Sequence, residues 1–150
     1  GGYPELHVFE LSENKSMLDA VRQAIFAGMP TLAECGGFLY LHDSMEDLQN
    51  HSYPMAGVIR GKCYNTGKLV RFGYAEFTLK DGMVLRGHEF HYYDSTNNGS
   101  DVSAKKPVGK RSWNCMHQTK HGLFGFGHLY YYSNPAFAQN FVKECEHFSK

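Results

Sequence analysis

Residues 30–41, PTLAECGGFLYL, restrict the fold more than any other stretch of the chain. A short apolar run leads to Cys35, and two glycines then open a second apolar run at helical spacing. This order predicts a buried strand over 30–35, a sharp turn at the cysteine and a helix over 36–45. A thiol at such a turn has two interpretations, one chemical and one structural.

In the chemical interpretation, Cys35 is a nucleophile exposed above the sheet. Ala33 and Gly37 flank it at minus two and plus two, where a tight strand-to-helix turn needs small side chains. The following helix would direct backbone N–H groups at the sulfur, favouring the thiolate and offering donors to an oxyanion. In the structural interpretation, Cys35 is a small buried hydrophobe, and Gly36 and Gly37 only allow the helix to pack closely.

The remaining cysteines lack the strand-glycine context of Cys35. They are scattered, without the close pairs typical of zinc or redox sites. We expect inert thiols in a reducing compartment at three positions: Cys63, Cys115 and Cys145.

Bulk composition limits the class of protein. A chain of 150 residues with 42% hydrophobic content can bury the core of one domain. Fifteen basic and fifteen acidic residues balance, with a pI near 7.3, so no overall positive field would recruit nucleic acid or an anionic membrane. No apolar run approaches the roughly 20 residues that span a bilayer, and no signal peptide is evident at the start. We expect a cytoplasmic domain, and the Gly-Gly start without Met suggests a piece of a longer protein.

Hydrophobic spacing predicts helices and strands in the first two thirds of the chain. Apolar residues recur at helical spacing over 12–28, with Ser12 as the N-terminal cap and with Gly28 and Pro30 ending the helix. Residues 55–93 are rich in Val, Tyr, Phe and Thr, which predicts strands, with a turn at 80–82.

The last third is predicted to contain a loop, two strands and a helix. Residues 95–111 hold almost no large apolar side chain and are expected to form an exposed loop. Strands are expected over 112–119 and 123–132, and a helix over 134–148 with Asn134 as its cap and Pro135 in its first turn. Helices at both ends of the chain favour an α/β layered fold over an all-β barrel.

A cysteine nucleophile needs a base within hydrogen-bond reach, and nine histidines are available. His128 ends a glycine-punctuated apolar strand just before a helix, where a side chain can project from a sheet edge. His88 and His91 alternate with Glu89 and Phe90 on an expected strand. Five of the others are expected to face solvent: His42, His51, His117, His121 and His147.

The HEFH sequence at 88–91 also suggests a metal site. A zinc-binding HExxH, however, needs two histidines four residues apart on a helix. His88 and His91 are three apart on an expected strand, so their side chains should point to opposite faces. We therefore expect no metal here.

Five stretches together resemble a known family: GGYPELH, LSENKSML, PTLAECGGFLYL, RGHEFHYY and GHLYYYSNP. In this order they resemble the glutamine amidotransferase domain of cobyrinic acid a,c-diamide synthases, in the cobyric acid synthase group. The resemblance implies a three-layer, flavodoxin-like class I amidotransferase sheet with flanking helices, truncated at its N-terminus. It implies that Cys35 attacks glutamine, that His128 is the base, and that the N–H groups of Gly2 and Gly36 form the oxyanion hole.

The resemblance also implies partners outside this chain. In complete family members the ammonia passes to an ATP-dependent synthetase domain, which amidates corrin carboxylates in cobalamin biosynthesis with magnesium present. No cofactor is implied for the amidotransferase domain itself. Many class I relatives place Glu two residues after the histidine as its orienter, but Tyr130 stands there. A Cys-His dyad, or a third member from elsewhere, is left open.

Glu89 and His91 match the HEFH signature of the family. They are expected either to line the glutamine pocket or orient His128, or only to hold the sheet through hydrogen bonds.

Two further functional hypotheses remain open from the sequence. One is a non-catalytic amidotransferase-like remnant that binds a partner through its aromatic residues, which make up 15% of the chain. The other is amidation of a different carboxylated substrate. A basic cluster between the expected strands, either solvated or meeting a phosphate or acidic surface, comprises Lys105, Lys106, Lys110 and Arg111.

Overall fold

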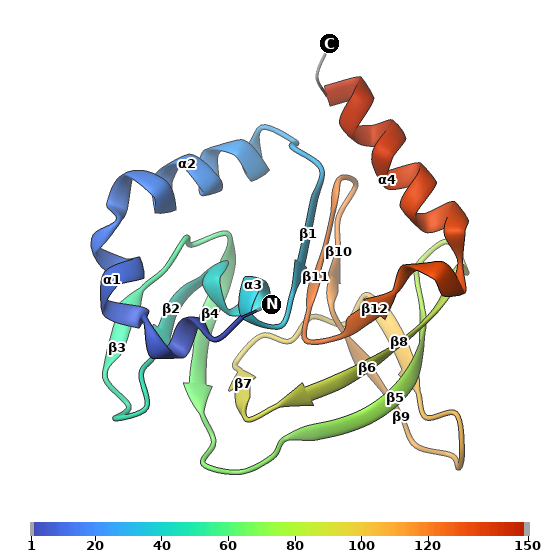
Figure 1. Ribbon diagram of the computed structural model, residues 1–150, viewed down its shortest axis with the longest axis horizontal. Helices are drawn as coiled ribbons and strands as arrows, with labels where there is room; N and C mark the ends of the chain where they lie inside the picture. Colours follow the sequence, from blue (N-terminus) through green and yellow to red (C-terminus); the bar gives the residue numbers. More distant parts are fainter. Residues whose placement is uncertain (1, 149–150) are drawn as a thin grey trace.

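The computed structural model describes residues 2–148 of the chain, which form a mixed α/β fold (Figure 1). Its helical elements are η1 (Pro4–Leu6), α1 (Val8–Glu13), α2 (Lys15–Phe26), α3 (Gly36–Tyr40), η2 (Tyr131–Ser133) and α4 (Pro135–Phe148). Its first strands are β1 (Thr31–Glu34), β2 (His42–Glu46), β3 (Ser52–Pro54), β4 (Ile59–Asn65), β5 (Arg71–Thr78) and β6 (Val84–His91). The later strands are β7 (Tyr93–Ser95), β8 (Val102–Lys105), β9 (Ser112–Cys115), β10 (His117–Gln118), β11 (Gly122–Gly125) and β12 (His128–Tyr130).

A three-stranded sheet in the order β1-β11-β10 lies at the centre of the molecule. β1 runs parallel to β11, with Thr31 opposite Gly122 and Glu34 opposite Gly125. β10 is antiparallel to β11. This sheet joins the end of β1, where Cys35 follows, to the segment that leads into β12.

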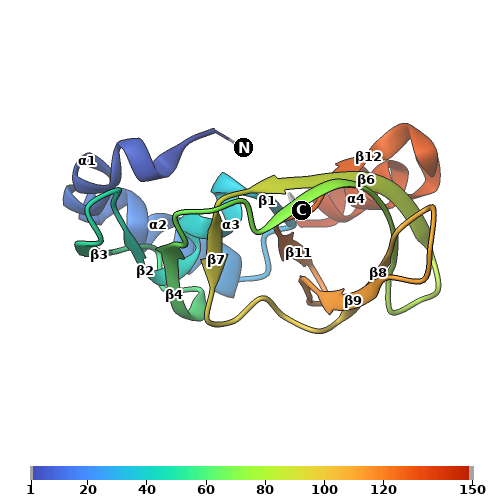
Figure 2. The same cartoon turned by 90° about the horizontal axis from the view of Figure 1, so that it is seen from below.

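An antiparallel five-stranded sheet in the order β12-β6-β5-β8-β9 forms the second unit. It curves, so that β6 and β12 lie along one side and β8 and β9 along the other (Figure 2). β12 pairs with β6 through His128 opposite His88 and Leu129 opposite Gly87. The pairing brings the C-terminal part of the chain onto β6, the strand that contains the HEFH segment.

A four-stranded sheet in the order β3-β2-β4-β7 lies on the side of α1 and α2 (Figure 1). The hydrophobic core has two clusters. One packs α2 and α3 against this sheet around Phe38, Met45 and Cys63, each fully buried. The other fills the five-stranded sheet around Phe77 and Val102. The site described below lies where these two halves meet at β1 and β11.

The α/β class expected from the sequence is confirmed, as are the strand before Cys35, the turn at 80–82 and the C-terminal helix. The first helix differs from its prediction at its start. Asn14, whose side chain accepts from the N–H of Met17, caps α2, and Ser12 instead lies in α1 with its hydroxyl donating to the Phe9 carbonyl. Met17, one of the apolar residues at helical spacing within the predicted helix, is 51% exposed.

The helix predicted over 36–45 is wrong in length. α3 ends at Tyr40, and the chain enters β2 at His42. His42, expected to face solvent, is therefore fully buried, with its ring nitrogens 2.8 Å from the Phe38 carbonyl and 2.7 Å from Ser95 Oγ. Those two polar partners satisfy the imidazole inside the core.

The loop predicted over 95–111 is also partly wrong. Val102 and Ala104 alternate inward from β8 and are fully buried in the core of the five-stranded sheet. Two small apolar residues were too weak a signal for a strand, and their burial depends on pairing with β5 and β9.

Candidate active site

Cys35 occupies a strained turn between β1 and α3. Its φ is +49° and its ψ is −106°, a backbone conformation that side-chain-bearing residues rarely adopt. The Cys35 N–H donates to the Gly125 carbonyl at 2.8 Å, which continues the pairing of β1 with β11. An added Cβ on Gly37 would lie 3.7 Å from the Ala33 Cβ, an ordinary van der Waals contact, so these two positions face each other across the turn. The predicted sharp turn is confirmed.

The thiol of Cys35 faces a cavity of about 360 Å³ and is only partly buried. The cavity is also lined by Gly2, His91, Tyr93 and Phe126. This volume suits a small polar ligand. The wholly structural interpretation, with a cysteine sealed in the core, does not describe this side chain.

The electrostatic surroundings of Cys35 differ from the expected ones. Burial raises the pKa of the Cys35 thiol, and the carboxylates of Glu5 and Glu34 raise it further. A hydrogen bond from the Gly36 N–H acts in the opposite direction but does not outweigh burial. The prediction that the helix N-terminus favours the thiolate is therefore wrong in its net direction. The resting group is a thiol, which needs a base to become a nucleophile.

His128 begins β12, three residues after Gly125, and its side chain is 30% exposed. Its Nδ1 lies 3.9 Å from Glu34 Oε2, and its ring stacks on His88 with centroids 5.0 Å apart. Burial lowers the pKa of His128, and His88 lowers it further, while Glu34 acts to raise it. His128 is thus neutral near pH 7 and able to accept a proton. His128 lies beside Glu34, the residue that precedes Cys35. His128 is not among the residues that line the cavity.

Sequence analysis missed Glu34 and Tyr131. Glu34 Oε1 accepts hydrogen bonds from the Tyr131 hydroxyl at 2.7 Å and from the Leu129 N–H at 3.3 Å. The partners are more than ninety residues apart in the sequence. The only local signal was the position of Glu34 next to the cysteine.

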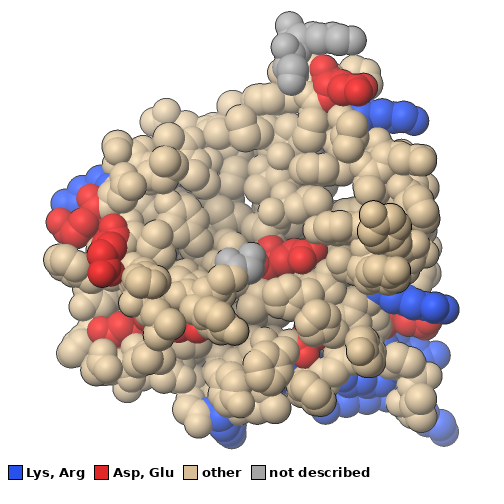
Figure 3. Space-filling model, viewed as in Figure 1, with Lys and Arg blue, Asp and Glu red and all other residues tan. Residues whose placement is uncertain are grey.

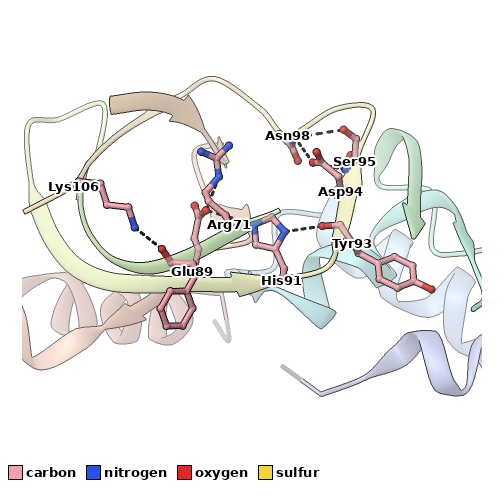
Figure 4. Close-up of polar contacts among 9 residues, drawn as sticks. Arg71, Glu89, His91, Tyr93, Asp94, Ser95, Asn98 and Lys106 are labelled. Atoms are coloured by element: carbon pink, nitrogen blue, oxygen red, sulfur yellow. Dashed lines mark hydrogen bonds and ion pairs between the residues drawn. The ribbon is translucent and has the colours of Figure 1, made fainter. Parts of the chain in front are cut away.

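Glu89 and His91 of the HEFH segment lie in a buried polar cluster with Arg71 (Figure 4). Arg71 Nε lies 2.9 Å from Glu89 Oε2, and His91 Nε2 lies 3.5 Å from the same oxygen. His91 Nδ1 donates to the Tyr93 carbonyl at 2.6 Å, and its ring stacks on Phe126 at 3.8 Å. His91 therefore reaches the cavity wall, while Glu89 lies behind it and ties β6 to β5. A role for either residue in glutamine binding stays a prediction.

Residues 1–125 match the family model of the CobB/CobQ-like glutamine amidotransferase domain. The chain belongs to this family. The resemblance and the class I amidotransferase-like α/β fold expected from the sequence are therefore confirmed.

Curated relatives agree with the family assignment. The cobyrinate a,c-diamide synthase of Caldanaerobacter subterraneus subsp. tengcongensis is 36% identical over 159 residues, covering 100% of this chain and 35% of the relative. The enzymes of the same name from Listeria innocua and Fusobacterium nucleatum are 36% and 35% identical, covering 91% and 93% of the chain and 32% of each relative. The chain thus spans about a third of the length of these relatives.

The two histidines of the HEFH sequence point to opposite faces of β6, as predicted: His88 is exposed and His91 is buried. Within residues 2–148, no group of three or more His, Cys, Asp or Glu side chains is arranged to hold a metal ion. In that same part of the chain, no helix has the length and apolar character needed to cross a membrane.

Two of the cysteines expected to be inert lie in the core. Cys63 and Cys115 are buried, and burial raises the pKa of both thiols, that of Cys115 to about 12. Neither lines the cavity beside Cys35.

The predicted basic cluster lies at the hairpin between β8 and β9. Lys106 Nζ donates to the Phe72 carbonyl at 2.6 Å and lies 5.8 Å from the ring centroid of Trp113, so this lysine is used within the fold. Figure 3 shows basic side chains at the margins of one face, whose middle carries carboxylates and uncharged residues. No positive field covers that face.

Some aromatic side chains of the tyrosine-rich segments lie in the core and others on the surface. Tyr93 is buried, whereas several aromatic side chains on the outer face of β5, β6 and β12 and beside these strands are 46–83% exposed. They are Phe72, Tyr74, Phe90, Tyr92, Tyr130 and Tyr132. Tyr130, two residues after His128, is thus a surface residue.

Proposed function

We propose that this domain hydrolyses glutamine to glutamate and ammonia, with Cys35 as the nucleophile and His128 as the general base. The observation that carries the proposal is the strained turn that places the Cys35 thiol in a cavity wall while β1 and β11 bring His128 beside Glu34. A protonated thiol and a neutral imidazole are the resting states that general-base activation requires.

The reaction proceeds in two halves. His128 removes the thiol proton as the sulfur attacks the side-chain carbonyl carbon of glutamine, and the oxyanion is held by backbone N–H groups of Gly36 and Gly2. The imidazolium returns its proton to the leaving nitrogen, so that ammonia departs and a glutamyl thioester remains. Water, deprotonated by His128, then attacks the thioester, glutamate departs, and the imidazolium returns the proton to the Cys35 sulfur. Two facts support the oxyanion donors: the Gly36 N–H already faces the Cys35 sulfur, and Gly2 lines the same cavity.

The ammonia is proposed to serve ATP-dependent amidation of the a and c carboxylates of cobyrinic acid, the reaction for which the relatives are named. Since this chain spans about a third of those relatives, the proposed sites for ATP, Mg²⁺ and the corrin lie outside its 150 residues. No cofactor is assigned to the amidotransferase domain. The reaction is placed in the cytoplasm, in keeping with the reduced thiols expected from the sequence.

The test combines covalent labelling with a glutaminase assay. A diazoketone analogue of glutamine should label Cys35 alone, as read by mass spectrometry of peptides. The Cys35→Ser variant should lose both labelling and glutaminase activity, and Cys145→Ser, a control with the same chemical change, should keep both. Labelling at another cysteine would remove the assignment of the nucleophile. Absence of labelling and of ammonia release, even with the synthetase portion of a relative added, would favour the non-catalytic interaction domain, which the family match does not favour.

A further inference from the structure

We infer that Glu34, the residue immediately before the nucleophile, is the positioning residue of His128. The inference rests on the proposed function and deepens it. Many class I relatives use a Glu two residues after the histidine, but Tyr130 holds that position here and is 60% exposed. The orienting carboxylate is instead supplied from the other strand of the parallel pair, at the end of β1.

Contacts on one carboxylate oxygen fix the direction of Glu34. Its Oε1 accepts from the Tyr131 hydroxyl at 2.7 Å and from the Leu129 N–H at 3.3 Å. Both donors lie within three residues after His128 in the chain, so the carboxylate is anchored to the segment that carries the base. Its Oε2 is left facing His128 Nδ1 at 3.9 Å. That separation is a charge contact, which the imidazolium formed during the reaction would strengthen.

The backbone keeps the two groups in register. Glu34 is opposite Gly125 in the parallel pair, and Cys35 donates to the Gly125 carbonyl. Between Gly125 and His128, Gly127 packs so tightly on the buried ring of Phe77 that an added Cβ would lie 2.9 Å from it. The segment leading to the base therefore has little room to shift relative to Glu34.

Among the described groups that act on His128, Glu34 is the one that favours its protonated form. Burial disfavours a positive charge on the His128 ring. His88, which stacks on that ring, and His91, at the buried end of β6, disfavour it too. Within residues 2–148, the ion-pair partner of Glu34 is His128 rather than any Lys or Arg. Tyr131 remains a hydrogen-bond donor because burial and the Glu34 carboxylate raise its pKa. The Glu34 carboxylate therefore pairs with the His128 ring and, within residues 2–148, with no Lys or Arg side chain.

Glu34→Gln tests the inference with almost no change in shape. The amide oxygen can keep the contacts to Tyr131 and Leu129, but the NH₂ group would face Nδ1 and favour the tautomer whose Nε2 cannot accept a proton. We expect kcat to fall by about tenfold or more. The loss should be smaller than the roughly 10⁴-fold loss seen when a fully buried orienting carboxylate is replaced, because Glu34 is 20% exposed. The KM for glutamine should stay within about twofold, since Glu34 does not line the cavity.

The pH profile separates positioning from structure. Loss of the negative charge lowers the pKa of His128, so the acidic limb of kcat/KM should move to lower pH. Glu34→Asp, which keeps the charge, should restore that limb in part. Glu144→Gln is the matched control, because Glu144 Oε2 pairs with His121 Nδ1 at 3.1 Å on the surface, and it should leave kcat and the profile unchanged.

Nuclear magnetic resonance gives a readout that does not require activity. In the unsubstituted chain, ¹⁵N shifts of the neutral His128 ring should show the proton on Nδ1, and in Glu34→Gln they should show it on Nε2. An Nε2–H ring in the unsubstituted chain, or unchanged kinetics in a folded Glu34→Gln variant with Cys35 still labelled, would overturn the inference alone. Failure of the unsubstituted chain to label Cys35 would instead overturn the proposed function.

Discussion

Gly87, in the middle of β6, should control where His128 lies. An added Cβ at this position would be 2.3 Å from the His128 carbonyl oxygen and 3.1 Å from Phe77 Cε2. Since Cβ atoms essentially never approach a heavy atom closer than 3.0 Å, Gly87→Ala must increase this separation between β6 and the His128 backbone by at least 0.7 Å, from 2.3 to 3.0 Å. Phe77 is fully buried and cannot yield. The displacement therefore falls on β12.

The size of the effect follows from that movement. Overpacking of this kind costs about 1–3 kcal/mol of unfolding free energy. A misplacement of about 1 Å in a catalytic group can cost on the order of 100-fold in rate. We expect both losses in Gly87→Ala, measured by urea denaturation and by steady-state release of ammonia from glutamine.

Gly82→Ala is the control that separates the two losses. Gly82 has φ +83° in the turn between β5 and β6, and an added Cβ would meet nothing within 4 Å. Backbone strain there should cost about 1 kcal/mol without moving β12, so kcat should not change. If Gly87→Ala kept the stability and kcat of the unsubstituted chain, or if Gly82→Ala lost as much kcat, positioning of the base by β6 would be refuted.

Two further substitutions test the electrostatics of the site. His88→Ala removes the stacked ring that lowers the pKa of His128 and exposes His128 to water, so that pKa should rise and the acidic limb of kcat/KM should move to higher pH. A limb that stayed in place or moved to lower pH would contradict this assignment. Glu89→Gln leaves the Arg71 guanidinium without its carboxylate partner. We expect the free energy of unfolding, measured with urea, to fall by about 2–4 kcal/mol. This is no more than the loss for a fully buried pair, because Arg71 is 24% exposed. Unchanged stability would exclude the structural role of Glu89, and a raised KM would show that it acts on glutamine through His91.

The turn at Cys35 could be predicted because its determinants are local. A short apolar run, a thiol and two glycines are contiguous in the sequence, and the structure has the strand and the strained residue where they were expected. The end of the following helix could not be predicted, because the burial of His42 depends on the Ser95 hydroxyl more than fifty residues away. Local patterns describe local geometry, whereas boundaries depend on what the rest of the fold buries.

Charge effects at the site were the least predictable. A helix N-terminus suggested a thiolate, but α3 has only five residues, and its effect is exceeded by burial and by two carboxylates, one of which adjoins Cys35. Glu34 itself was invisible as a site residue because its partners, Leu129 and Tyr131, are brought to it by the pairing of β1 with β11.

A sulfur that holds its proton at rest has a consequence for chemical selectivity. Alkylating reagents and peroxides react with the thiolate, so Cys35 should resist iodoacetamide near neutral pH. The pH at which its alkylation rate is half-maximal should lie above the ordinary pKa of a cysteine. A substrate-shaped electrophile is different, because once seated it can recruit the neighbouring imidazole to withdraw the proton. Cys35 would then be protected from oxidants without a protective lid. Rapid alkylation at pH 7 in the absence of glutamine would show that this protection does not exist.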